Sequence, residues 1–364
     1  MLHAYPVEAT LDNWLHENLC SLLRILQQKL DQGENTVENQ QSWKSLVTQA
    51  VVPEKREFFS KAYGIRDRFF EYKTELCKLA PEKRSEILEV LDSQNRISHL
   101  LDGTEQIQLL SSKSVALHEV AKRLFVFCYE RLLGTNARTR QYEVIFKSLD
   151  DKICPFCGID RVMDPEDTAQ DQDHYLAKSI YPFAAVNMKN LVPMCRSCNR
   201  DYKKNIDMIV DENGARRKAF NPYHCDPPRI SVSGSSPIPD ATPIGFNWEI
   251  EFLSSVEEAE NWDRVFSIRE RYRRDVLNHY FGKWLGAFAG KCAKDRKRGI
   301  IGTELAEEEI RCQLAQYQED KAEFPSPGLA GFLEPLVFEM LLKLYDSKHE
   351  RIVNFVRDAV VGIP

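Results

Sequence analysis

The chain has 364 residues, of which 43% are hydrophobic, so it is long enough for two or three globular domains with packed cores. Its 16 glycines and 17 prolines are too few for a collagen-like or linker-dominated protein. The formal net charge of −6 argues against a nucleic-acid partner for the chain as a whole, although the charge of a single segment can differ from this value.

The N-terminal residues 1–149 are predicted to be helical. Leucines recur every three or four positions across residues 12–30, which is the spacing of a helix with one buried stripe, and the same period returns across 87–100 and 115–132. The first residues lack the basic and apolar parts of a signal peptide, and the longest apolar run, 124–129, is too short to span a membrane. We therefore expect a cytoplasmic protein without membrane contact.

The helical period breaks across residues 150–225, where cysteine, aspartate, asparagine and proline interrupt it, and we interpret this stretch as a compact irregular domain. Residues 226–247 hold five prolines and a Ser-Gly-Ser-Ser run, which predicts a linker or long surface loop. Residues 248–364 are predicted to be helical again, after a short strand at 248–252. The helical periods of this last region lie at about 256–289, 303–317, 334–346 and 349–360.

Four of the ten cysteines form two Cys-x-x-Cys pairs: Cys154 with Cys157, and Cys195 with Cys198. A two-residue spacer lets both sulfur atoms of a pair face one point, and Gly158 or Asn199 directly after the pair can adopt the turn conformation. Four thiolates complete the tetrahedral shell of Zn²⁺, so we predict a structural zinc site; a redox pair and unrelated buried thiols are the alternatives. The other cysteines are predicted to be bystanders, and those in helical patterns to be small core residues: Cys20, Cys77, Cys128, Cys292 and Cys312.

Between the two pairs lies Asp173-His174, followed by Asn190-Leu-Val-Pro, and Asn199 comes directly after the last cysteine of the second pair. This ordered combination resembles the HNH endonuclease family over about residues 150–206. The resemblance implies a ββα-metal fold, in which a two-stranded ribbon and one helix surround a single divalent ion. The expected architecture is therefore mainly α, with helical N- and C-terminal regions around an embedded HNH domain that carries the zinc site.

The sequence departs from the family pattern at three positions. Asn199 stands where the third signature residue is often His, as in HNN-type variants of the family. Ala177 replaces a proline that is common shortly after Asp-His, which changes the rigidity of a turn more than the chemistry. Tyr202 stands where a lysine is usual, so the cation that contacts phosphate is left open between its basic neighbours.

Phosphodiester hydrolysis needs a base for the attacking water and a cation for the leaving oxygen. A neutral imidazole suits the first task, so His174 is the candidate general base. Asp173 and Asn199 supply oxygen ligands suited to Mg²⁺ or Mn²⁺, and the resemblance implies that Asn190 helps to orient His174. A degenerate site that only binds is the alternative. Three basic residues are candidates for binding substrate: Arg200, Lys203 and Lys204.

Two segments are locally basic in spite of the overall charge. Residues 189–218 hold eight basic against four acidic side chains, and residues 269–298 hold ten against three. Such segments neutralise backbone phosphates, and Tyr280, Phe281 and Trp284 would stack on bases if they were exposed. The alternative for the second segment is the solvated face of a helix whose aromatic residues are core.

We therefore expect a metal-dependent HNH endonuclease that hydrolyses phosphodiester bonds, with DNA favoured over RNA. The chain also resembles effector nucleases of bacterial anti-phage defence systems, some of which act beside an ATPase. Because an uncontrolled nuclease would damage its host, we expect the helical regions to mediate homo-oligomerisation or regulation by a partner or ligand. Two other functions stay open. A non-catalytic zinc-ribbon module that binds nucleic acid or protein would need only the four cysteines, whereas an RNA-cleaving toxin would share every catalytic residue.

Overall fold

The structure, a computed structural model, describes residues 1–34, 38–132, 134–166, 172–241, 243–302, 306–325 and 330–361. These residues form two compact units, each mainly helical, which confirms the predicted mainly α fold class. The first unit holds Met1 and the described parts of 3–152 and 162–226; the second holds Leu2, residues 153–161 and the described residues from 227 onward. In this part of the chain no helix is both long and apolar enough to cross a membrane.

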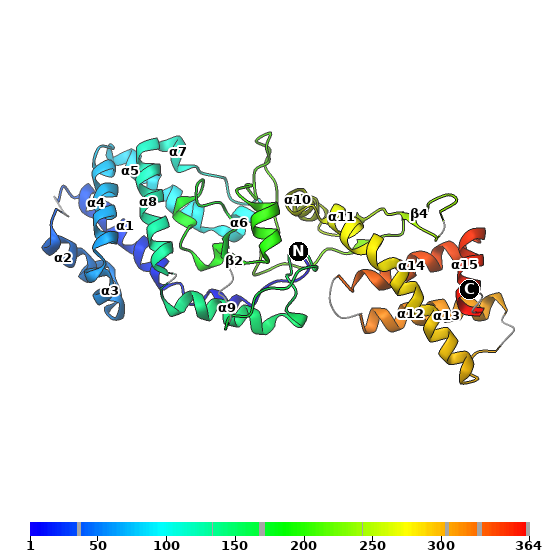
Figure 1. Cartoon of the computed structure of the whole chain (residues 1–364). Helices are drawn as coiled ribbons and strands as arrows, with labels where there is room; N and C mark the ends of the chain where they lie inside the picture. The colour runs from blue at the N-terminus through cyan, green and yellow to red at the C-terminus, as the bar shows by residue number, and fades with distance from the viewer. Residues whose placement is uncertain are drawn as a thin grey trace. The chain divides into compact units, whose positions relative to one another are not determined.

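The first unit joins the N-terminal helices to most of the segment expected to form a separate domain at 150–225. Its helices α4 and α8 lie side by side, and α1 packs against α2 and α5 (Figure 1). Its α-helices are α1 Trp14–Asp31, α2 Gln40–Ala50, α3 Arg56–Lys61, α4 Tyr63–Cys77, α5 Pro81–Asn95, α6 Ile97–Asp102, α7 Leu110–Lys113, α8 Val115–Leu132 and α9 Asn136–Ser148. Two strands, β1 Gln172–His174 and β2 Leu191–Pro193, are followed by a short π-helix, Ser197–Lys203.

The second unit begins with short strands and continues with helices. Its strands pair in two antiparallel ladders, β3 with β6 and β4 with β5. The bounds are β3 Ile230–Ser231, β4 Ser236–Pro237, β5 Phe246–Asn247, β6 Glu251–Phe252, α10 Val256–Phe266, α11 Ile268–Arg271, a π-turn Tyr272–Leu277, α12 Asn278–Lys297, α13 Glu307–Glu323, α14 Leu333–Asp346 and α15 Glu350–Val361.

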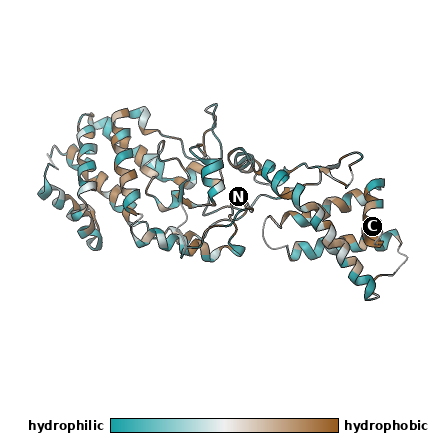
Figure 2. Ribbon diagram, viewed as in Figure 1, coloured by the Kyte–Doolittle hydropathy of each residue, from teal (hydrophilic) through white to brown (hydrophobic). Residues whose placement is uncertain are grey.

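The helices form where the sequence supplies a buried stripe and a start or stop signal. The leucine stripe of α1 is buried along its length, and Figure 2 shows hydrophobic and hydrophilic stretches alternating along most helices. Asn39 caps α2 in a capping box with Ser42, Pro81 occupies the first position of α5, and α6 ends at Gly103, whose φ is +85°. These local signals explain why the helical period predicted the helices well.

Several predicted segments differ from the structure. The stretch 226–247, expected to be a linker or loop, contributes β3, β4 and β5 and belongs to the second unit, with two-residue strands that its prolines still permit. The helical period at 256–289 is broken at Ser267, whose φ of +51° is left-handed and separates α10 from α11. The first residues of the predicted 303–317 helix, 303–305, lie outside the described residues, and α13 extends from Glu307 to Glu323.

The chain between β1 and β2 is buried in the core of the helical region. Phe183, Ala185, Val186 and Met188 belong to the same hydrophobic core as the inner faces of α1, α4, α5 and α8. The Phe183 ring lies 5.3 Å from that of Phe125 on α8, measured between centroids. Burial of this apolar segment ties the two strands to the N-terminal helices, which sequence analysis treated as a separate region.

Asn187 fixes the same segment with polar contacts. It is 4% exposed, and its side-chain amide donates to Asn95 Oδ1 at 3.1 Å and lies 3.4 Å from His16 Nε2. Its Oδ1 atom accepts from Asn13 Nδ2 at 3.3 Å, and Asn13 Oδ1 accepts from the backbone N–H of Met188 at 2.9 Å. The ends of α1 and α5 therefore hold this turn through satisfied buried amides.

Replacing Phe183 with alanine removes the largest apolar side chain of this buried segment. We expect Phe183→Ala to lower the free energy of unfolding by about 3–5 kcal/mol, because the side chain is fully buried and leaves a cavity. Urea unfolding measures the change. Val115→Ala, at a position that is 68% exposed on α8, serves as the control and should change stability by less than about 0.5 kcal/mol.

Burial lowers the pKa of His16 to about 4, with a smaller contribution from the Arg24 charge. The unfolded chain therefore binds a proton more readily than the folded one, and the stability that neutral His16 contributes is lost as the pH falls from about 6.5 towards 4. We expect the urea midpoint of wild type to fall more steeply over this window than that of His16→Gln. Parallel pH profiles of the two proteins would contradict this account.

Candidate active site and metal centre

Strands β1 and β2 pair antiparallel, with Gln172 opposite Pro193, Asp173 opposite Val192 and His174 opposite Leu191. The π-helix Ser197–Lys203 begins four residues after β2. These elements place Asp173, His174 and Asn199 on the wall of one cavity of about 530 Å³ in the first unit.

The cavity is rich in positive charge. Among its described lining residues, four are basic and Asp173 is the only carboxylate. A cavity with this balance attracts anionic groups such as phosphates. The basic side chains are Lys178, Arg200, Lys203 and Lys204.

The imidazole of His174 is held from two sides. It is 8% exposed, and its Nε2 atom lies 3.0 Å from the carbonyl oxygen of Ala185, so in the neutral ring Nε2 carries the proton and Nδ1 keeps the lone pair. The ring of Tyr129, on α8, contacts it edge-on with 4.4 Å between centroids. Burial, and to a lesser degree the Lys178 charge, lowers the pKa of His174 to about 3, which keeps the imidazole neutral at pH 7.

Asp173 lies beside a buried cation. Lys203 Nζ is 2.7 Å from Asp173 Oδ2 and donates a hydrogen bond to the carbonyl oxygen of His174 at 3.0 Å. Burial raises the pKa of Asp173, although the Lys203 charge opposes this shift. The buried Oδ2 atom accepts no well-directed hydrogen bond, so its contact with Lys203 is an ion pair.

Asn190 supports the turn that holds His174. It is fully buried; its amide donates to the carbonyl oxygens of Leu176 at 3.0 Å and Ala184 at 3.1 Å, and its Oδ1 atom accepts from the N–H of Leu176 at 2.7 Å. Ala184 precedes Ala185, the residue that accepts from His174. Asn190 therefore acts on the imidazole through the backbone, and it does not line the cavity.

The helical region supplies residues that sequence analysis did not find. Tyr129 lines the cavity, and its hydroxyl donates to the carbonyl oxygen of Gln172 at 3.3 Å. Gln141 and Arg138, on α9, hold the Gln172 side chain at 2.6 and 3.0 Å. No motif marks these residues, because Tyr129 ends an apolar helical run and its function depends on packing against a strand more than forty residues later.

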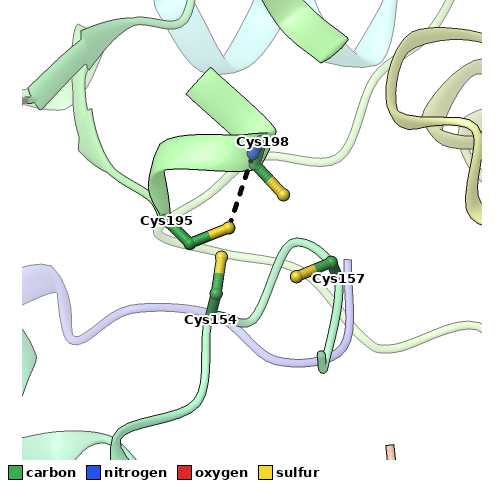
Figure 3. Close-up of side chains that lie close together, drawn as sticks. All are labelled: Cys154, Cys157, Cys195 and Cys198. Carbon is green, nitrogen blue, oxygen red and sulfur yellow. Dashed lines mark hydrogen bonds between the residues drawn. The ribbon is translucent and has the colours of Figure 1, made fainter. Parts of the chain in front are cut away.

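The four paired cysteines form a buried cluster. The sulfur atoms of Cys154, Cys157, Cys195 and Cys198 all lie within 4.8 Å of one another and point toward a common centre (Figure 3). A tetrahedral zinc shell has sulfur atoms about 4 Å apart, so the cluster could hold a metal ion such as zinc. As thiolates, the four buried side chains would need a cation to offset their charge.

Backbone N–H groups support the sulfur atoms in both pairs. Ile159 N–H donates to Cys157 Sγ and Cys198 N–H to Cys195 Sγ, each at 3.4 Å. Gly158 takes a left-handed φ of +66°, as expected for the turn, and a Cβ atom there would clash with Leu2. Asn199 does not adopt the expected turn conformation, because it continues the π-helix.

The candidate substrate-binding residues differ in exposure. Arg200 and Lys204 are exposed on the rim of the cavity, as a contact with phosphate requires. Lys203 lines the same cavity but is only 1% exposed and is paired with Asp173, and its contact with substrate stays a prediction. The sequence pattern alone did not distinguish these neighbours.

The second basic segment is largely engaged within the protein. Arg269 lies 2.5 Å from Glu260 and 2.9 Å from Asp263, and the aromatic side chains Phe281 and Trp284 are 5% and 6% exposed. These two rings are core residues of the second unit and do not stack on an external base. The two rings match the alternative in which the aromatic residues of this segment are core, and a contact of its exposed basic side chains with nucleic acid stays a prediction.

Comparison with family models, curated proteins and solved structures finds no match for this chain. The functional proposal therefore rests on the residues, on their geometry and on the motif resemblance described above.

Loss of the cysteine cluster should destabilise the protein. We expect the purified chain to contain one zinc ion, and Cys195→Ser or a strong chelator to lower the melting temperature by 5 °C or more, because ion binding contributes to folding. Elemental analysis and thermal unfolding measure both effects. Cys77→Ser is the control and should retain the ion, because Cys77, like Cys312, is exposed and not in the core as predicted. A Cys195→Ser protein that melts like wild type would refute the structural zinc.

Proposed function

We propose that this chain is a metal-dependent endonuclease of the HNH type that hydrolyses phosphodiester bonds, with DNA as the favoured substrate. The observation that carries the proposal is the convergence of Asp173, His174 and Asn199 on one basic cavity. The order strand, strand, helix and the neighbouring cysteine cluster support it further, because both match the sequence resemblance.

Each residue of the site has a separate role in hydrolysis. His174 accepts a proton from the attacking water at Nδ1, since Nε2 is held by the Ala185 carbonyl. Asn190 positions this ring through the backbone of the buried turn. The exposed Arg200 and Lys204 orient the phosphodiester backbone at the rim of the cavity.

Asp173 and Asn199 would hold the divalent ion. One is a carboxylate with a buried oxygen that accepts no hydrogen bond, and the other is an amide, so the donor set fits the hard cations Mg²⁺ and Mn²⁺. When bound, such an ion stabilises the charge that develops on the leaving oxygen. Asn199 directly follows Cys198, so a structural ion at the cysteine cluster would help to fix this ligand.

The basic cavity agrees with either DNA or RNA as substrate, and the preference for DNA follows from the sequence resemblance. The anti-phage role, the ATPase partner and homo-oligomerisation likewise stay predictions of that resemblance. A purely binding zinc module would use the cysteine cluster but would have no need for a neutral, oriented imidazole inside a basic cavity.

The proposal is tested with plasmid DNA and with RNA, each incubated with the protein and Mg²⁺ or Mn²⁺, beside EDTA controls. We expect His174→Ala to cut at least about 100-fold more slowly than wild type, because a general base contributes a factor of this size. His224→Ala removes an exposed histidine outside the cavity and should cut normally.

Each outcome of this assay has a clear meaning. Equal cutting by His174→Ala and wild type contradicts the proposed mechanism. Cleavage of RNA alone would favour the RNA-cleaving alternative, and binding of nucleic acid without cleavage would favour the zinc-ribbon module. Circular dichroism checks that the variants keep their helical content.

A further inference from the structure

The side chain of Lys203 is a buried cation at the centre of the candidate site. It is 1% exposed, whereas Arg200 and Lys204, which line the same cavity, are exposed. Its ammonium makes two contacts with the adjacent residues of β1, an ion pair of 2.7 Å with Asp173 Oδ2 and a hydrogen bond of 3.0 Å to the His174 carbonyl oxygen. A buried charge is retained only when it is compensated in this way.

Lys203 and Asn199 reach the cavity from the same short helix, Ser197–Lys203. Asn199 supplies an oxygen atom that is a candidate metal ligand. Lys203 supplies a positive charge that pairs with Asp173, the other candidate ligand. The Asp173 carboxylate is the only one among the described residues that line the cavity. Any cation that enters must therefore share it with Lys203.

Two cations cannot occupy the same carboxylate oxygen at low cost. A divalent ion binds a carboxylate at about 2.1 Å, and the ammonium of Lys203 already lies 2.7 Å from Oδ2, so the two charges would repel at short range in a buried site. The contact between this oxygen and Lys203 joins two opposite charges at 2.7 Å, and an entering ion must break it.

We propose that Lys203 is a resident counter-cation of the site, which a divalent ion displaces from Asp173. The ammonium neutralises and positions the carboxylate before the ion arrives, and its departure is part of ion binding. This inference rests on the proposed function, because it takes Asp173 as a ligand of the hydrolytic ion. The affinity for the divalent ion then depends on how easily it displaces the Lys203 ammonium. Lys203 is a positioning residue for Asp173.

The test measures Mn²⁺ binding to the full chain by electron paramagnetic resonance, without nucleic acid. Lys203→Met keeps the length of the side chain and removes its charge; Lys204→Met makes the same change of net charge at an exposed position of the same cavity. We expect Lys203→Met to bind Mn²⁺ at least about tenfold more tightly than wild type and Lys204→Met to differ by less than about threefold. Adding Asp173→Asn to Lys203→Met should remove the gain.

A second measurement uses the unaltered protein and does not depend on the folding of a variant. An amine-acetylating reagent is applied with and without Mn²⁺, and the modified lysines are read by peptide mass spectrometry. Lys203 should be protected without the ion and become reactive when Mn²⁺ is bound, while Lys204 should react in both cases.

The inference is overturned if Lys203→Met folds and binds Mn²⁺ no more tightly than wild type, if no protein in the series binds the ion, or if Lys203 stays protected at saturating Mn²⁺. These outcomes are distinct from failure of the nuclease proposal, which is read from cleavage by His174→Ala. If cleavage depends on His174 but Mn²⁺ does not displace Lys203, the nuclease proposal holds and only the proposed role of Lys203 is wrong.

Discussion

Burial of the turn between β1 and β2 in the helical core is the constraint on which the candidate site depends. Phe183 packs against α8, and Asn187 is held by the ends of α1 and α5, so both flanks of Ala185 are anchored to the helical core. That carbonyl orients His174. A catalytic role for the imidazole therefore requires the N-terminal helices as well as the strands that carry the motif.

The electrostatics of the cavity follow from the same packing. Bringing Asp173 and His174 out of water costs solvation, and the protein offsets this cost differently for each group. The carboxylate pairs with the ammonium of Lys203. The imidazole stays neutral, donates a hydrogen bond to the Ala185 carbonyl and packs against the ring of Tyr129. One short helix brings Asn199 and Lys203 to this pair, and its first turn contains Cys198 of the cysteine cluster.

Sequence analysis predicted the features that local spacing determines. Helical periods located α1, α5 and α8 in the first unit and most helices of the second, but not α2, α3, α4 or α9, and the two Cys-x-x-Cys pairs correctly identified the four clustered sulfur atoms. Tyr129 and the burial of Lys203 could not be predicted, because they depend on which surfaces meet across long stretches of chain. The break at Ser267 was missed for another reason. The left-handed backbone conformation of a serine does not change the spacing of the apolar residues around it.

The buried turn also has a consequence for dynamics. Partial opening of the helical core would release the Ala185 carbonyl and the Tyr129 edge, and His174 would lose both restraints. The orientation of His174 thus depends on the local stability of α5 and α8 and not only on that of the short β-ribbon. A ligand that loosens or tightens these helices would control the imidazole from a distance, with no contact to the cavity.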